Sequence, residues 1–167
     1  MIIGSCGAGK STLARQLHEK NGIELIHLDK EYFAPNWVEP TKEDWSKTVE
    51  SLIQKPNWII DGNYGGTMDM RLNTADKIIF LNRSRWLCLY RVIKRIIMNY
   101  GKSRPDAAEG CNERFDWNFL VYTFHFNDFK RPKIFDRLSK LPSSKEVIIL
   151  KSNNDVKQFL QHDITTS

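Results

Sequence analysis

A glycine-rich stretch near the start of the chain constrains the fold more than any other feature. Residues 4–11 read Gly-Ser-Cys-Gly-Ala-Gly-Lys-Ser and satisfy every fixed position of the pattern Gly-x-x-x-x-Gly-Lys-Ser/Thr. Residues 1–3 before it are apolar, as in a buried strand. Residues 12–17 after it carry two leucines at the i, i+4 spacing of a helix that packs on a sheet. The pattern therefore predicts a strand, a phosphate-binding loop and a helix in direct succession.

Glycines in such a loop let backbone N–H groups converge on one hollow of the size of an anion, and the start of the helix adds its positive dipole. Lys10 is expected to reach the β- and γ-phosphates of ATP, and the Ser11 hydroxyl to ligate Mg²⁺. A glycine-rich turn that binds nothing is the alternative, which the complete motif disfavours. The residues predicted to contact the nucleotide are Gly4, Ser5, Cys6, Gly7, Ala8, Gly9, Lys10, Ser11 and Thr12.

Length and composition predict one domain over residues 1–167, because 167 residues with 41% hydrophobic content can bury a substantial core. No apolar run approaches the ~20 residues of a membrane span, and no signal-like stretch is seen, so we expect a cytoplasmic protein without a membrane partner. The cysteines, Cys6, Cys88 and Cys111, are scattered and predict reduced thiols. The net charge of +5 favours anionic partners, which a phosphate-handling enzyme and a nucleic-acid binder share.

Short apolar segments alternate with amphipathic ones along the chain. Expected strands cover residues 1–4, 23–28, 58–60, 77–81 and 147–150. This alternation predicts a mostly five-stranded parallel sheet with helices on both faces. A long helix is expected from residue 85 to 100, with arginine and lysine on one face. Its apolar residues are expected to face inward: Trp86, Leu89, Tyr90, Val92, Ile93, Ile96 and Ile97.

Two aspartates, Asp29 and Asp61, follow expected strands, at the edge where parallel sheets bind ligands. A carboxylate there can hold Mg²⁺, or it can orient and deprotonate an acceptor hydroxyl. Turn or capping aspartates are the alternative. His27 is expected to pack or to form a hydrogen bond within its strand.

Residues 77–105 contain eight basic side chains and no acidic one. Arg91 and Arg95 are one helical turn apart, so they share a face and can stabilise a phosphoryl group in transfer. A nucleic-acid patch and an ordinary solvated surface remain alternatives. Arg104 lies in the polar stretch after this helix, where it can move with a ligand.

Together, the phosphate loop, Asp29 after His27-Leu28, Trp37, the run Ile-Asp-Gly-Asn-Tyr at residues 60–64 and the basic helix resemble the adenylate-kinase-like small P-loop kinases. Within them the chain is most similar to the DNA topology modulation proteins, over nearly its whole length. The resemblance implies a three-layer P-loop NTPase fold with a helical lid around residues 101–114. It also implies ATP as phosphoryl donor, with Asp29 facing the acceptor and Asp61 near Mg²⁺.

One departure bears on the acceptor. Adenylate kinases follow this Asp-Gly with an aromatic residue, proline and an arginine that grips the acceptor phosphate, whereas residues 63–66 here read Asn-Tyr-Gly-Gly. Arg71 is a candidate replacement. We expect a magnesium-dependent kinase of a small molecule, such as a nucleotide or nucleoside, with Lys10, Asp29, Arg91, Arg95 and Arg104 acting in catalysis. The alternative is an ATP-binding, DNA-associated regulator.

Overall fold

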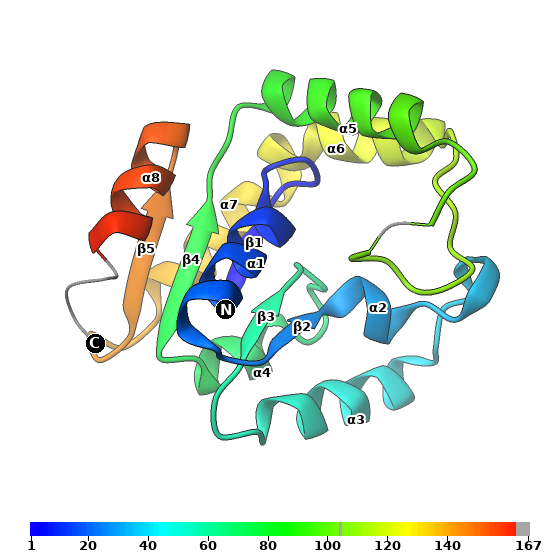
Figure 1. Ribbon diagram of the computed structural model, residues 1–167. Helices are drawn as coiled ribbons and strands as arrows, with labels where there is room; N and C mark the ends of the chain where they lie inside the picture. The colour runs from blue at the N-terminus through cyan, green and yellow to red at the C-terminus, as the bar shows by residue number, and fades with distance from the viewer. Residues whose placement is uncertain (104, 163–167) are drawn as a thin grey trace.

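Five parallel strands form one sheet, in the order β2-β3-β1-β4-β5 (Figure 1). The computed structural model describes residues 1–103 and 105–162. The predicted five-stranded parallel sheet is thereby confirmed. The strands are β1 Ile2–Gly4, β2 Leu25–His27, β3 Ile59–Asp61, β4 Lys77–Leu81 and β5 Glu146–Leu150.

Helices cover both faces of this sheet, which makes three layers (Figure 1). Two of their ends follow signals in the sequence. Thr41 accepts a hydrogen bond from the Asp44 N–H at 3.1 Å and caps α3, and Gly22 ends α1 with a φ of 66°. The helices are α1 Lys10–Asn21, α2 Leu28–Tyr32, the 3₁₀ turn η1 Pro35–Trp37, α3 Lys42–Ile53, α4 Met68–Thr74, α5 Arg85–Asn99, α6 Trp117–Phe129, α7 Arg131–Ser139 and α8 Asn153–His162.

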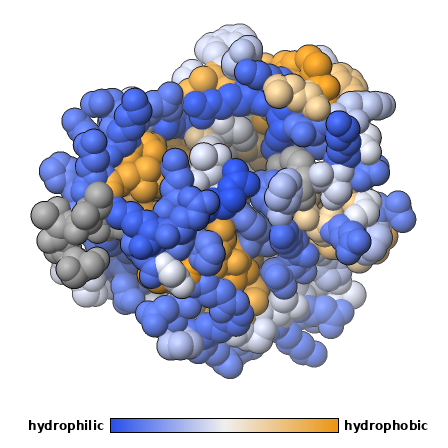
Figure 2. Space-filling view, viewed as in Figure 1, coloured by the Kyte–Doolittle hydropathy of each residue, from blue (hydrophilic) through white to orange (hydrophobic). Residues whose placement is uncertain are grey.

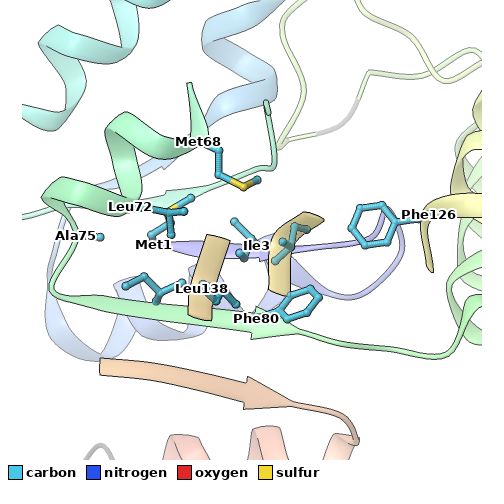
Figure 3. Close-up of a cluster of buried hydrophobic side chains, with 10 residues drawn as sticks. Met1, Ile3, Met68, Leu72, Ala75, Phe80, Phe126 and Leu138 are labelled. Carbon is cyan, nitrogen blue, oxygen red and sulfur yellow. The ribbon is translucent and has the colours of Figure 1, made fainter. Parts of the chain in front are cut away.

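The central strands are apolar on both faces because each face meets its own layer of helices. Ile3 and Phe80 point to one side, where they pack with side chains of α4, α6 and α7 (Figure 3). Ile2 and Ile79 point to the other side, into a cluster that includes Leu13 of α1 and Cys88 of α5. The central strands are therefore packed on both faces, and the phosphate loop leaves the carboxyl end of β1 from this rigid support.

Two expectations about the elements were wrong. The second strand ends at His27, and the chain turns at once into α2, so Asp29 lies in the first turn of a short helix. Much of the predicted inward face of α5 is exposed: the exposed fractions of Trp86, Tyr90 and Ile97 are 67%, 61% and 74%. Only the side of α5 that meets the phosphate loop and α6 is buried, through Cys88, Val92 and Ile96.

Within residues 1–103 and 105–162, no helix is long and apolar enough to cross a membrane. Cys6, Cys88 and Cys111 form no disulfide bond with one another.

Candidate functional site

The phosphate loop joins β1 to α1 and is fixed by side chains from both sides. The Asn63 side chain accepts from the Gly4 N–H at 3.0 Å and donates to the Gly4 carbonyl at 2.7 Å. Lys10 Nζ donates to the Ser5 carbonyl at 3.0 Å, so the lysine lies along the loop. Residues 6–12 line a large cavity, whereas Gly4 and Ser5 are buried behind it.

Two glycines of the loop adopt conformations that other residues rarely take. Gly7 has a φ of 74°, and a Cβ atom there would lie 2.4 Å from the Cys88 carbonyl of α5. Gly9 has a φ of 100° and precedes α1. The loop and α5 therefore pack backbone against backbone, which places the basic helix directly over the phosphate loop (Figure 1).

The cavity in front of the loop has a volume of about 1480 Å³. Its walls come from the loop, α5, α6, α7 and the connections that follow β2 and β3. Pockets for one small molecule usually measure roughly 300–1000 Å³. The cavity can therefore hold a nucleotide together with a second molecule.

Asp29 lines this cavity and accepts a hydrogen bond from the Tyr64 hydroxyl at 2.7 Å. Burial, and then the charge of Asp29, raise the pKa of Tyr64 far above its usual value, so the phenol stays protonated and donates. The Tyr64 ring also contacts the rings of Tyr32 and Trp45, at centroid distances of 4.7 and 5.0 Å. Asp29 is thus a positioned carboxylate beside an aromatic wall.

Asp61 also borders the cavity but is 4% exposed. Its Oδ1 lies 2.7 Å from Nδ1 of His27, which is 9% exposed. The pairing follows from register, because His27 and Asp61 are opposite each other on parallel strands β2 and β3. His27 therefore forms the hydrogen bond that was expected, and its partner is the proposed metal ligand. Among the described residues, no group of three or more His, Cys, Asp or Glu can hold a metal by itself.

Arg91 and Arg95 of α5 reach the cavity in different ways. Nη1 of Arg91 lies 3.5 Å and 3.4 Å from the carbonyls of Gly7 and Ala8, so its guanidinium covers the phosphate loop. Nε of Arg95 lies 3.0 Å from Oε1 of Glu113, a carboxylate that is 5% exposed. Arg95 is therefore held by an acidic residue of the segment expected to be a lid. Arg104 lies outside the described residues.

Another arginine that lines the cavity, Arg83, escaped the sequence analysis. It follows β4, is 5% exposed, and lines the cavity with Arg91 and the phosphate loop. Its Nε has no hydrogen-bond partner among the described residues, and burial, with a contribution from Arg91, lowers its pKa. A desolvated guanidinium next to another cation favours an anion in the cavity. Its position directly after an apolar strand was the signal in the sequence.

Arg71 does not have the role suggested for it. Its side chain is 0% exposed and does not line the cavity. The guanidinium donates to backbone carbonyls of residues 62, 63 and 64, and Nε donates to that of Thr67. Arg71 thus fixes the loop after β3, which carries Asn63 and Tyr64, and cannot grip an acceptor phosphate in this conformation.

The segment expected to be a lid is docked on the loop after α2. The described part of residues 101–114 contains turns and isolated bridges, and the helices α5 and α6 flank it. The Trp37 indole donates to the Asn112 carbonyl at 3.2 Å, and the Asn36 N–H to the Gly110 carbonyl at 3.3 Å. Asn36 and Trp37 both have positive φ, 65° and 64°. These contacts join two segments that both line the cavity, through Trp37 on one side and Glu113 and Arg114 on the other.

Comparison with known proteins gives a likeness of fold. No protein family and no curated protein matches the chain. A structure of deoxyadenosine kinase from M. mycoides with the products dCMP and a flexible dCDP has a TM-score of 0.51 and 17% identity. That alignment covers 98% of this chain and 95% of the other. A second structure of deoxyadenosine kinase from M. mycoides, with bound dCTP, gives 0.49 and 16%, over 99% and 98% of the two chains. The order of the sheet and this likeness show that the chain has the P-loop kinase fold. No comparison supports the resemblance to DNA topology modulation proteins.

Proposed function

We propose that this protein is a kinase that transfers the γ-phosphoryl group of ATP to the hydroxyl of a small molecule, with a nucleoside or nucleotide as the first candidates. The observation that carries the proposal is the convergence on one cavity of a phosphate loop, a positioned carboxylate and the arginines that follow β4 and lie on α5, namely Arg83, Arg91 and Arg95. A phosphate-binding loop alone serves many functions. A cavity large enough for two molecules, with Asp29 facing it, favours transfer between them.

Binding of the donor rests on the loop and on the cations around it. Backbone N–H groups of residues 6–12 and Lys10 Nζ would hold the β- and γ-phosphates, once Lys10 exchanges the Ser5 carbonyl for phosphate oxygen. Arg83 and Arg91 would neutralise further charge of the triphosphate, since both already lie beside the loop. Arg95 would join them if its ion pair with Glu113 opens.

The residues present fit a magnesium ion. Ser11 and Asp61 offer a hydroxyl and a carboxylate oxygen at the cavity wall, and Mg²⁺ prefers one or two such protein ligands together with phosphates and water. The hydrogen bond from His27 would orient the Asp61 carboxylate. The ion would supply charge neutralisation at the β- and γ-phosphates.

Transfer would use Asp29 as the proton acceptor. The acceptor oxygen attacks the γ-phosphorus while Asp29 takes the hydroxyl proton. The bond from the γ-phosphorus to the bridging oxygen breaks, and ADP leaves. Tyr64 fixes the Asp29 carboxylate through its hydrogen bond, and the neighbouring rings offer a stacking surface for a flat acceptor.

A panel of nucleosides, nucleotides and sugars incubated with γ-labelled ATP and Mg²⁺ tests the proposal. Wild-type protein is expected to label at least one of them, and Lys10→Ala to reduce transfer by about 100-fold or more, because it removes a charge at the transferred group. Lys47→Ala is the matched control, since Lys47 is exposed on α3 and lies outside the cavity. ATP binding undetectable by calorimetry, with no product from any acceptor, would refute the proposal.

A further inference from the structure

Helix α5 carries a row of exposed apolar side chains on the side away from the sheet. Trp86, Tyr90, Ile93 and Ile97 follow the spacing i, i+4, i+7, i+11 and therefore share one face. Their exposed fractions are 67%, 61%, 39% and 74%. The buried side of the same helix is separate and already packed, through Val92 and its neighbours. The exposed row is thus not part of the core of the protein.

Helix α6 continues this surface beside α5. Trp117 and Val121 are 67% and 40% exposed, and Phe124, one turn further, is half-buried. The rings of Trp86 and Phe124 contact each other at a centroid distance of 5.2 Å, which joins the two rows. We call the joined surface the apolar face; it consists of Trp86, Tyr90, Ile93, Ile97, Trp117, Val121 and Phe124. Figure 2 shows hydrophobic residues gathered at the upper edge of the molecule, where α5 lies.

The two helices run antiparallel. Arg85, at the start of α5, pairs with Asp128 near the end of α6, whereas Arg95, further along α5, lies over the ring of Phe119 near the start of α6. An antiparallel pair with one apolar side is half of a four-helix arrangement. A second identical pair would complete it.

The area agrees with what a dimer needs. Trp86, Tyr90 and Trp117, each about two-thirds exposed, offer on the order of 300–500 Å² together. The aliphatic members of the apolar face add roughly 100–200 Å². A standard interface buries about 800 Å² per partner, of which roughly 65% is apolar in homodimers, so about 500 Å² of apolar surface suffices. The apolar face, at about 400–700 Å², reaches this value. It also lies toward the upper end of the range for the largest apolar patch of a typical monomer, which is roughly 300–600 Å².

The charges around the apolar face fit an identical partner better than a charged one. Arg85 and Asp128 sit at one end of it and neutralise each other, with Nη1 donating to Oδ2 at 2.8 Å. The seven members of the apolar face carry no charge. A two-fold axis brings a surface against its own copy, so the seven uncharged members meet no repulsion there. The exposed Lys94 follows Ile93 and borders the face, where water and salt screen its charge.

From these observations we propose that the apolar face of α5 and α6 is the interface of a symmetric homodimer. The inference does not rest on the proposed function, although α5 would link the two: it packs against the phosphate loop at Gly7 and carries Arg91 into the cavity. Dimer formation would hold this helix, and with it the arginines over the donor site, in place.

Sedimentation equilibrium of the full chain over about 1–100 μM tests the proposal, with two adjacent residues as a matched pair. Ile97→Lys places a charge in the apolar face. Met98→Lys places the same charge one residue on, at a side chain that is 65% exposed and lies about 100° round the helix from Ile97. Both helix positions accept lysine equally well. We expect a dimer for wild type and Met98→Lys, and a dissociation constant raised at least about 30-fold for Ile97→Lys.

Tyr90→Lys is a second disruptive variant, and circular dichroism of each protein checks that it is folded. Four results would overturn the proposal: a wild-type monomer at the highest concentration, a dimer that both disruptive variants leave intact, equal dissociation by Met98→Lys, or a monomer that binds vesicles of neutral and anionic lipid through the apolar face. The last result would assign this face to a membrane surface instead.

Discussion

Substitution of Arg83 by methionine tests whether a buried arginine serves a ligand or the fold, and Arg71 provides the contrast. Both side chains are almost inaccessible, with exposed fractions of 5% and 0%. The Arg71 guanidinium donates to several backbone carbonyls, including that of Gly62 at 2.9 Å, whereas the Arg83 Nε donates to none. The two arginines are therefore expected to respond in opposite ways to loss of charge.

The magnitudes follow from these contacts. A hydrogen bond to a charged group contributes about 1.5–3 kcal/mol, and Arg71→Met strands several carbonyls, so we expect a loss of about 3–5 kcal/mol in the free energy of unfolding. Arg83→Met removes a desolvated charge whose Nε has no hydrogen-bond partner among the described residues. The free energy of unfolding should therefore stay within about 1 kcal/mol of wild type or rise. Loss of one charged contact to a phosphate should weaken ATP binding by roughly 10- to 150-fold.

Urea unfolding followed by tryptophan fluorescence gives the stabilities, and calorimetry with Mg²⁺ and a non-hydrolysable ATP analogue gives the affinities. Arg85→Met is the control for loss of positive charge, since Arg85 follows the same strand but does not line the cavity. Its ATP affinity should match wild type. If Arg83→Met loses 3 kcal/mol or more while it keeps wild-type ATP affinity, Arg83 is structural and the reasoning fails.

Three further outcomes are expected. Tyr64→Phe should slow phosphoryl transfer by roughly 10-fold and leave ATP affinity unchanged, because it releases the Asp29 carboxylate but touches no donor contact; a normal rate in the steady-state assay would contradict this. Amide hydrogen exchange in residues 105–114 should slow when donor and acceptor analogues bind together; strong protection of the empty protein that ligands leave unchanged would argue against a lid. Alanine at Arg91 or Arg95 should slow transfer by orders of magnitude and leave only weak, salt-sensitive DNA binding in all proteins; tight duplex binding at physiological salt with unaffected turnover would favour the DNA-associated regulator.

Local sequence was sufficient to predict the phosphate loop. The phosphate loop is set by glycines that tolerate positive φ, by the lysine and by the apolar strand before them, and all of these are neighbours in the chain. The same holds for the sheet, because strands buried on both faces read as continuous apolar runs such as residues 77–81. Pattern and structure agree wherever the deciding contacts are within a few residues.

Partners distant in the chain could not be read in this way. The sequence correctly predicted that Asp29 and Asp61 lie near the carboxyl ends of the strands. The contacts of Tyr64 with Asp29 and of His27 with Asp61 depend instead on strand order and register. Arg71 illustrates the same limit, since a basic residue near the site was as compatible with phosphate as with backbone carbonyls. Only the path of residues 62–67 around its guanidinium decided between them.

The sequence by itself determined that a phosphate-loop motif precedes α1 and that a parallel sheet is buried between helices, because both follow from local backbone preference and from hydrophobic periodicity. Tertiary structure alone decided which apolar residues of α5 are core and which are surface. Periodicity shows that a helix has an apolar side but not what covers it. Val92 and Ile96 pack against Leu120 of α6, whereas Tyr90 and Ile97 remain exposed. Likewise, only the folded structure distinguishes Arg83 from the other basic residues of its stretch. It places Arg83 in the wall of the cavity, where burial of a guanidinium whose Nε has no partner among the described residues favours a bound anion.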